Sequence, residues 1–398
     1  MNKMLGDAYI VAATRTPVGK APRGAFRHTR PDSMLAHVLR SVLAQRPEID
    51  PGRVDDVIVG CAMPEYEQGM NVARIGVLLA GLPDTVAGMT INRFCSSGLN
   101  AVSIAADRIR TGEADIMIAA GTESMSMIPM LGRLALNREV FAKDENVGIA
   151  YGMGLTAEKV ASQWKVSRDA QDEFALSSHR KALTAQADGE FDAEISPYPL
   201  SEDVPDLASG KIVTRKRPFT QDEGPRKDAS AEGLAKLRPV FSARGSVTAG
   251  NSSQTSDGAG ASILVSERVL KSLKLEPLAR WVGFAVAGVP PDVMGIGPIA
   301  AIPKLLAQTG VSQDALDWIE LNEAFAAQSL AVINELHLDP QKVNPLGGAI
   351  ALGHPLGATG AVRTATIVHG MRRRKQKYGM VSMCVGTGMG AAGMYESL

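Results

Sequence analysis

The stretch Ile91-Asn92-Arg93-Phe94-Cys95-Ser96-Ser97-Gly98 leads from an apolar, strand-like run directly into a helical pattern. Apolar residues recur at helical spacing from Leu99 to Ile109, which predicts a helix over residues 96–110. A buried strand is predicted next, at residues 115–120 (Asp-Ile-Met-Ile-Ala-Ala). Strands that alternate with amphipathic helices in this way are typical of α/β proteins.

The same alternation recurs on both sides of a segment with a different composition. That segment contains a charged helical stretch at 157–186 and a polar, proline-containing stretch at 195–238. We therefore predict one α/β unit from residues 1–124 and 256–276, an insertion over 125–255, and a second α/β unit over 277–398. The other predicted strands are 8–13, 55–59, 261–266, 280–286, 317–321 and 378–385, and the other predicted helices are 299–308, 323–336 and 359–374.

Length and composition limit the class of protein. The 398 residues suggest two or three domains, at roughly 100–200 residues for each domain. The 42 Lys and Arg residues balance 42 Asp and Glu residues, which argues against a broad surface for nucleic acid or acidic membrane. Three cysteines do not make a disulfide framework. The sequence shows neither a secretory signal pattern nor an apolar run near ~18 residues, so we expect a cytoplasmic protein outside the membrane.

Cys95 is the first candidate for chemistry, because the pattern places it at the start of the predicted helix. Unpaired backbone N–H groups and the helix dipole at such a position favour a thiolate over a thiol. Ser96 and Ser97 can cap the helix, and Gly98 permits close approach of another backbone or of a substrate. The alternative is a small buried residue at a strand–helix junction, which is common for free cysteine.

The other two cysteines have different surroundings. Cys384 ends an apolar strand and precedes a glycine-rich turn, Gly386-Thr387-Gly388, where a side chain can face a cavity beside exposed backbone amides. Taken alone, an inert buried cysteine is the better interpretation of that position. Cys61 has no comparable neighbours and is interpreted as structural.

His354 differs from the other five histidines because it lies in a glycine-dense, uncharged loop at 347–357. Such a loop can hold an imidazole rigidly in a dry pocket, which suits a general base. The alternative is a ligand-binding glycine loop in which His354 only packs. Asn322 follows the predicted strand 317–321, and its amide can orient a water or a carbonyl oxygen. The simpler interpretation of Asn322 is a helix N-cap.

Two further patterns are set aside. Residues 388–393 (Gly-Met-Gly-Ala-Ala-Gly) match the spacing of a dinucleotide-binding fingerprint, which requires a helix after it. Only residues 394–398 follow, so we interpret this match as accidental. The Cys and His residues do not have the spacing of a zinc site, and no metal is expected.

Together these segments closely resemble the thiolase family over essentially the whole chain. Within the family, residues 288–298 and 383–392 look most like the 3-ketoacyl-CoA thiolases (acetyl-CoA acyltransferases) of fatty-acid degradation. The resemblance implies two similar mixed α/β units layered helix–sheet–helix–sheet–helix, an inserted loop domain that binds CoA and makes oligomer contacts, and dimers or tetramers of identical chains. It is carried by Asn92-Arg93-Phe94-Cys95-Ser96-Ser97-Gly98, Gly250-Asn251-Ser252-Ser253, Asn322-Glu323-Ala324-Phe325, Gly353-His354-Pro355 and Cys384-Val385-Gly386-Thr387-Gly388.

The resemblance also implies a mechanism. Cys95 attacks the 3-keto carbon of a 3-ketoacyl-CoA after His354 takes its proton. Cys384 protonates the acetyl-CoA enolate that leaves, and then deprotonates the second CoA that removes the acyl group from Cys95. Negative charge on the thioester oxygens is stabilised at two sites. One consists of His354 and a water held by Asn322, and the other of the backbone N–H groups of Cys95 and Gly386.

For CoA, which is a substrate here and not a resident cofactor, the resemblance points to five residues. Arg226 lies near the adenine and phosphate end and Ser253 lies on the pantetheine, whereas Met153, Met294 and Phe325 border the acyl or pantetheine channel. One departure concerns Gly152, where short-chain biosynthetic thiolases typically carry a histidine. The missing side chain is consistent with a roomier acyl site.

Several alternatives remain open at this point. The near one is a short-chain acetoacetyl-CoA thiolase (acetyl-CoA acetyltransferase) that works in the condensation direction, because the reaction is reversible. A decarboxylating condensing enzyme of the same superfamily would not need a thiol at Cys384. A Cys–His hydrolase built on Cys95 and His354 leaves Cys384 unexplained. A non-catalytic CoA-binding relative is disfavoured by the three intact residues Cys95, His354 and Cys384.

Overall fold

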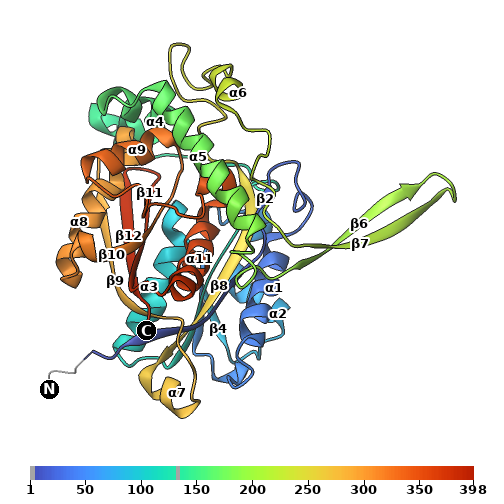
Figure 1. Cartoon of the computed structure of the whole chain (residues 1–398). Coiled ribbons are helices and arrows are strands. Elements are labelled where there is room, and N and C mark those ends of the chain that lie inside the picture. Colours follow the sequence, from blue (N-terminus) through green and yellow to red (C-terminus); the bar gives the residue numbers. More distant parts are fainter. Residues whose placement is uncertain (1–4, 131–134) are drawn as a thin grey trace.

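The computed structural model describes residues 5–130 and 135–398, and most of its strands form one sheet of ten strands (Figure 1). The strand order is β10-β11-β12-β9-β1-β8-β5-β3-β4, and β2 pairs with β8. The strands are β1 (Ala8–Arg15), β2 (Gly19–Lys20), β3 (Asp56–Gly60), β4 (Ala87–Ile91), β5 (Ile116–Ser124), β8 (Ser256–Ser266), β9 (Ala279–Gly288), β10 (Leu316–Leu321), β11 (Tyr378–Val385) and β12 (Met389–Glu396).

The sheet consists of two halves that meet at β1 and β9. In the first half, β3 pairs in parallel with β4 and β5, and β5, β8 and β1 are antiparallel neighbours. In the second half, β10 and β11 are parallel, and β11, β12 and β9 are antiparallel neighbours. The junction is short, because only Tyr9 and Ile10 of β1 pair with β9. Each half therefore combines a parallel pair of strands with antiparallel neighbours next to the junction.

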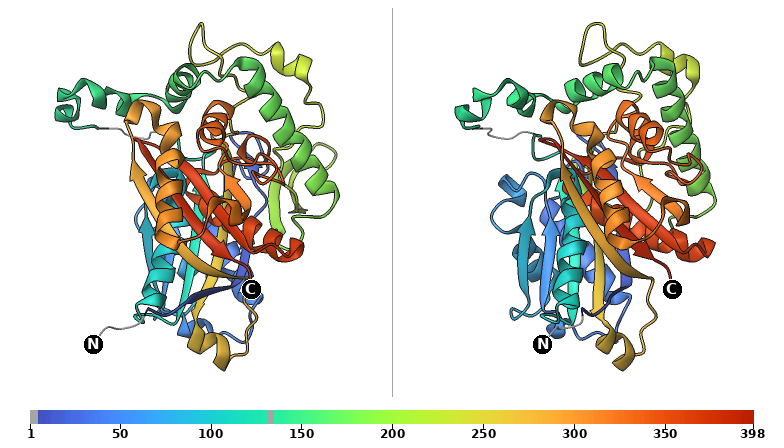
Figure 2. Two further views of the ribbon diagram at one scale, coloured as in Figure 1. Left: turned by 60° about the vertical axis from the view of Figure 1, so that its left-hand side comes forward. Right: turned by 90° about the vertical axis from the view of Figure 1, so that its left-hand side faces the viewer.

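Helices separate and cover the two halves, which confirms the layered fold predicted from the resemblance (Figure 2). The middle layer consists of α3 and α11, which contact each other and strands of both halves. The outer face of the first half is covered by α1 and α2, and that of the second half by α8. The bounds are α1 (Pro31–Ala44), α2 (Val72–Ala80), α3 (Ser97–Arg110), α7 (Glu267–Ser272), α8 (Gly297–Thr309), α9 (Ala326–Glu335), α10 (Ala349–Leu352) and α11 (Thr359–Arg374).

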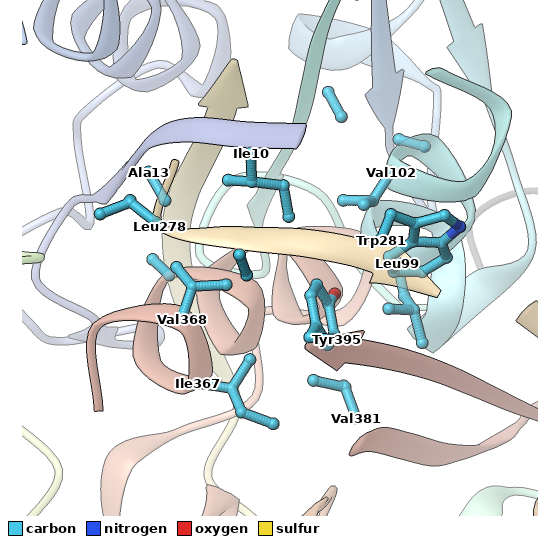
Figure 3. Packing of buried hydrophobic residues seen from close by; sticks show 14 of the residues in the cluster. Ile10, Ala13, Leu99, Val102, Leu278, Trp281, Ile367, Val368, Val381 and Tyr395 are labelled. Atoms are coloured by element: carbon cyan, nitrogen blue, oxygen red, sulfur yellow. The ribbon is translucent and has the colours of Figure 1, made fainter. Parts of the chain in front are cut away.

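The largest side chains of the core lie around the middle layer (Figure 3). Leu99 and Val102, from the apolar stripe of α3, are fully buried there. Trp281 of β9 and Tyr395 of β12 meet edge to face, with 5.0 Å between ring centroids. This burial is the main favourable contribution to folding, and it fixes the position of α3, whose first turn follows Cys95.

The insertion differs from its prediction in two respects. The predicted helical stretch 157–186 is two helices, α4 (Met153–Gln163) and α5 (Arg168–Ala187), because Lys165 between them adopts a left-handed φ of 54°. The polar stretch 195–238 contains a hairpin of β6 (Tyr198–Asp206) and β7 (Lys211–Phe219), which projects from the body (Figure 1), and the short α6 (Ala231–Ala235). Prolines are tolerated in the hairpin because a two-stranded ribbon has free edges.

Two other predictions need correction. Residues 389–396 form strand β12 between β11 and β9, where the sequence analysis predicted no strand or helix. The sequence did not predict this strand because it is rich in glycine and alanine and is buried on both faces. It therefore lacks the alternation of apolar and polar residues that marks a half-buried strand. The helix predicted at 323–336 begins only at Ala326. The helix at 359–374 and the strand at 378–385 lie where they were predicted.

A buried ionic cluster joins the insertion to the first half of the sheet. Arg15 at the end of β1 donates to Asp222 at 2.7 and 3.0 Å and to Glu194 at 2.6 Å. The side chains of all three residues are at most 2% exposed. Asp222 also accepts a hydrogen bond from the backbone N–H of Val18. The insertion is therefore held to the core by charge as well as by packing.

Candidate active site

Cys95 lies two residues before Ser97, where α3 begins, in a 3-10 turn formed by Phe94–Ser96. Asn92 shapes this turn, because its side-chain oxygen accepts the backbone N–H of Phe94 at 2.8 Å. The hydroxyl of Ser97 accepts the backbone N–H of Arg93 at 2.8 Å. The sequence Asn-Arg-Phe-Cys-Ser-Ser thus places the thiol at the junction between β4 and α3, as predicted.

The expected thiolate at Cys95 is not the resting state. Removal of water raises the pKa of the Cys95 thiol to about 11, although its own backbone N–H and that of Gly386 lower it. The negative charge of Glu123 raises this pKa further. Desolvation therefore outweighs the favourable position at the helix start. The two N–H groups nevertheless point at the sulfur, where a thioester oxygen on Cys95 would also lie within their reach.

The Cys95 thiol opens into a mainly apolar cavity of about 360 Å³. Its walls come from the loop after β3, from the turn after β11 and from the insertion. Gly152 is exposed and is not among the residues that line this cavity. The apolar lining includes Met63, Phe94, Met130, Leu136, Ile149 and Met153. A hydrocarbon chain attached near Cys95 fits these walls.

Cys384 lies at the end of β11 and is fully buried. It belongs to an apolar cluster that contains Met294 and Phe325, and Met153 packs against the same cluster. Burial raises the pKa of the Cys384 thiol, and the nearby Cys95 raises it further. Met153 packs against this cluster and also lines the Cys95 cavity, so the fold brings both cysteines into one site.

The turn after Cys384 requires glycine at position 388. Gly388 has a left-handed φ of 90°, and a Cβ there would lie 2.4 Å from the carbonyl oxygen of Val289. At Gly386, by contrast, a Cβ would make only an ordinary van der Waals contact of 3.6 Å with the ring of Phe94. The chain can therefore turn from β11 into β12 while the N–H of Gly386 remains close to Cys95.

His354 is 5% exposed and is held at both ring nitrogens. Its Nδ1 lies 2.6 Å from the hydroxyl of Thr359, and its Nε2 lies 3.4 Å from the side-chain nitrogen of Asn322. Because an amide nitrogen only donates, Nε2 is the acceptor and the ring proton is on Nδ1. Burial, with a smaller effect of Arg363, lowers the pKa of His354 to about 3, so the imidazole is neutral at pH 7. In the described part of the chain no hydrogen bond joins His354 to either thiol.

Asn322 does not cap a helix, so its simpler interpretation was wrong. The chain enters α9 three residues later, at Phe325, and the backbone N–H of Asn322 donates to Ser382 of the neighbouring strand. Its side-chain nitrogen faces His354, while its side-chain oxygen is buried and meets no donor among the described residues. This oxygen can accept a hydrogen bond from a bound water.

The structure does not bring the five residues predicted to contact CoA together in one place. Met153, Met294 and Phe325 lie around Cys384 and the Cys95 cavity. Arg226 instead lines a second cavity of about 260 Å³, together with Ser252. Ser253 is not among the residues that line this cavity, and its backbone N–H donates to Ala324.

The sequence analysis missed Glu123, a fully buried carboxylate beside the site. It accepts backbone N–H groups from Ala62 at 2.7 Å, Met63 at 3.2 Å and Gly357 at 2.8 Å, and a side-chain N–H of Gln68. Burial raises the pKa of Glu123 to about 7. An acidic residue at the end of an apolar strand, in Gly-Thr-Glu-Ser, was the available signal.

Within residues 5–130 and 135–398, no cluster of three or more His, Cys, Asp or Glu side chains could hold a metal ion. The helices in these ranges are all too short or too polar to cross a bilayer.

Comparisons with known proteins agree with this geometry. The model of the thiolase N-terminal domain matches residues 8–268, and that of the thiolase C-terminal domain matches residues 275–397. The chain is 48% identical to a 3-ketoacyl-CoA thiolase of Bacillus subtilis, over 98% of this chain and 99% of that protein. It is 45% identical to the peroxisomal 3-ketoacyl-CoA thiolase A of Mus musculus, over 98% of this chain and 91% of that protein.

Two solved structures are also similar over their full length. The Bacillus anthracis acetyl-CoA acetyltransferase has a TM-score of 0.88 and 40% identity, covering 99% of this chain and 100% of that chain. The human mitochondrial 3-ketoacyl-CoA thiolase has a TM-score of 0.88 and 36% identity, covering 100% of both chains. The two thiolase domain models together match residues 8–268 and 275–397, which is nearly the whole chain. The chain therefore belongs to the thiolase family.

Proposed function

We propose that the protein is a 3-ketoacyl-CoA thiolase, which uses CoA to cleave a 3-ketoacyl-CoA into acetyl-CoA and an acyl-CoA shortened by two carbons. The observation that carries this proposal is the apolar cavity of about 360 Å³ that opens on the Cys95 thiol beside Gly386. A thiol, two backbone donors and a hydrocarbon-sized space are the parts that acyl transfer through a thioester requires. CoA acts as a substrate and is released in each cycle.

In the first half of the reaction, the proton of the Cys95 thiol moves to Nε2 of His354, and the sulfur attacks the 3-keto carbon. The electrons of the broken C2–C3 bond pass to the acetyl-CoA enolate, which takes the proton of Cys384 at C2. The acyl group stays on Cys95 as a thioester, whose oxygen accepts from the N–H groups of Cys95 and Gly386. The enolate oxygen is stabilised by His354 and by a water on Asn322.

In the second half, a new CoA loses its thiol proton to Cys384 and attacks the thioester. The shortened acyl-CoA leaves, and the Cys95 sulfur regains its proton from His354. The neutral state of His354 supports this role, because a base must start without a proton. The low basicity of His354 and the high pKa of Cys95 keep both groups uncharged until substrate is bound.

The second candidate is an acetyl-CoA acetyltransferase that favours acetoacetyl-CoA, and the similarity to the Bacillus anthracis structure supports it. The apolar walls of the Cys95 cavity favour longer acyl chains instead. Thiolysis should be measured as kcat/KM for 3-ketoacyl-CoA substrates of increasing chain length, with Cys95→Ser as the inactive control. Activity confined to acetoacetyl-CoA would establish the second candidate, and activity retained by Cys95→Ser would refute Cys95 as nucleophile.

We also propose how the chain is organised and assembled. The insertion at 125–255 would bind CoA, a role supported by the cavity at Arg226, and the flanking units would supply the reacting groups.

Identical chains would associate through β4, whose outer edge meets no strand in the described sheet and whose Met89 is exposed. The free state of all three cysteines suits the reducing cytoplasm. Light scattering of the purified protein tests the assembly.

A further inference from the structure

Two residues with a strained backbone lie beside the two N–H groups that face the Cys95 sulfur. In the described part of the chain, Phe94 and Thr387 are the only non-glycine residues that combine a positive φ, of 43° and 69°, with a place in the wall of the Cys95 cavity. Phe94 immediately precedes Cys95, and Thr387 immediately follows Gly386. A positive φ is an outlier for a bulky or β-branched residue, and such outliers persist only where the surrounding structure enforces them.

The backbone of Phe94 is held in this conformation by neighbours on both sides. Its N–H donates to the side-chain oxygen of Asn92 at 2.8 Å, and its carbonyl oxygen accepts from the hydroxyl of Ser97 at 2.7 Å. The same hydroxyl accepts the backbone N–H of Arg93 at 2.8 Å, so it is engaged as donor and acceptor at once. The direction of the Cys95 N–H, which belongs to the next peptide, is therefore fixed by side chains as well as by the 3-10 turn.

The ring of Phe94 reaches the second N–H donor, which comes from the other half of the molecule. A Cβ placed on Gly386 would lie 3.6 Å from Cγ of the Phe94 ring, so no side chain separates the ring from the backbone of Gly386. The turn Phe94–Ser96 also packs against β11, which ends directly before Gly386. Phe94 packs in addition against the core cluster that contains Leu99. One residue therefore contacts both donors, the first through its backbone and the second through its ring.

We infer that Phe94 is a positioning residue, which aligns the N–H groups of Cys95 and Gly386 on one thioester oxygen through its left-handed backbone and through the contact of its ring with Gly386. The inference rests on the proposed function, since it assumes that Cys95 carries an acyl group. Donors stabilise a developing oxyanion only when they are preorganised at its position, and here they belong to different halves of the sheet. A contact that aligns the two halves at this point acts on the rate and not on substrate binding.

Three substitutions of Phe94 separate the contribution of the ring from that of the backbone. Phe94→Ala removes the ring. Phe94→Val keeps an apolar side chain but opposes the positive φ, because valine is β-branched. Phe94→Leu keeps more apolar bulk without a branch at Cβ, so it is the conservative variant. The matched control is Lys274→Ala, because Lys274 also has a left-handed φ, of 51°, but is exposed in the loop after α7.

Thiolysis is measured with acetoacetyl-CoA, because its acetyl group makes the least use of the cavity wall to which Phe94 contributes. We expect Phe94→Ala and Phe94→Val to lower kcat about 10²-fold, the cost of misplacing a catalytic group by ~1 Å. Since the interaction with the oxyanion is made only in the transition state, kcat/KM should fall by the same factor and KM should stay unchanged. Phe94→Leu should keep most of the rate, and Lys274→Ala all of it. Full activity in Phe94→Ala, or a rise in KM with kcat unchanged, would overturn the inference.

A vibrational measurement tests the alignment directly, and a loss of stability alone does not change it. Wild type and the Phe94 variants are acetylated with acetoacetyl-CoA carrying ¹³C at its 3-keto carbon, without free CoA, and the labelled carbonyl on Cys95 is followed by infrared difference spectroscopy. Hydrogen bonds to a carbonyl oxygen lower its stretching frequency, so we expect a lower frequency in wild type and Phe94→Leu than in Phe94→Ala and Phe94→Val. Equal frequencies in these proteins would overturn the inference and leave the proposed function intact. A wild type that is never acetylated would overturn the proposed function, and the inference with it.

Discussion

At the scale of single residues, the site is notable for groups that are uncharged at rest. Cys95, Cys384 and His354 all lie in surroundings that exclude water and favour their neutral forms. The sequence indicated all three residues as candidates, with Cys95 at a helix start, Cys384 at a strand end before a glycine-rich turn, and His354 in a glycine-dense loop. Their protonation could not be predicted from the sequence, since desolvation depends on segments hundreds of residues apart.

The raised pKa of Cys95 has a direct consequence for its reactivity in the free enzyme. Only the thiolate reacts with iodoacetamide, and its fraction grows tenfold per pH unit below the pKa. With a pKa of about 11, the alkylation rate of Cys95 should keep rising from pH 6 to pH 9. The rate is followed by mass spectrometry of the Cys95 peptide. A plateau below pH 8 would show a stabilised thiolate and contradict this account.

At the scale of secondary-structure elements, Glu123 joins three segments that surround the acyl cavity. Its carboxylate binds the loop after β3 at Ala62 and Met63 and the turn after His354 at Gly357. Met63 lines the cavity, and the 3-10 turn of Leu356–Ala358 precedes α11. One side chain therefore positions two opposite walls of the site.

Glu123 should also make stability depend on pH. Burial raises its pKa from 4.5 to about 7 in the folded state, so between these values the folded protein binds more protons than the unfolded chain. The contribution of Glu123 to the free energy of unfolding is therefore fully present below about pH 4.5, and it is lost as the pH rises toward 7. The fall should be on the order of 2–3 kcal/mol. Urea unfolding at pH 5 and pH 7 should show this fall in wild type and a smaller one in Glu123→Gln. Equal pH dependence in both proteins would contradict the prediction.

The elements that the sequence predicted well are those with a clear apolar period, such as α3 and α11. β12 was missed because its glycines and alanines are buried on both faces and give no period. The β6–β7 hairpin was missed for the opposite reason, since most of its residues are exposed and polar. The walls of the Cys95 cavity could not be predicted from the sequence, because they come from five separate stretches of chain that only the fold brings together.

At the scale of the whole molecule, the site depends on an insertion that is held to the core by buried charge. Arg15, Glu194 and Asp222 form the connection, and Thr366 of α11 donates to Glu194 at 2.9 Å. Three segments distant in sequence thus share one ionic cluster. The position of α5, and with it the Arg226 cavity, follows from this attachment.

Removal of Arg15 should destabilise the whole fold. Arg15→Met would leave two buried carboxylates without their cation and lower the free energy of unfolding by about 3–5 kcal/mol. The matched control is Arg268→Met, because Arg268 is 79% exposed in its pair with Asp115. That change should cost less than ~1 kcal/mol. Denaturant unfolding of both variants checks the comparison, and similar losses would contradict the role given to the buried cluster.

The central claim is that the shortened acyl group is carried on Cys95 between the two half-reactions. The most direct measurement is mass spectrometry of the protein after incubation with 3-ketoacyl-CoA substrates of four to twelve carbons without free CoA. We predict a mass increase equal to the acyl group two carbons shorter than each substrate, located on the Cys95 peptide and absent in Cys95→Ser. An acyl group on Cys384 or Cys61, or turnover without any acylated protein, would contradict the account.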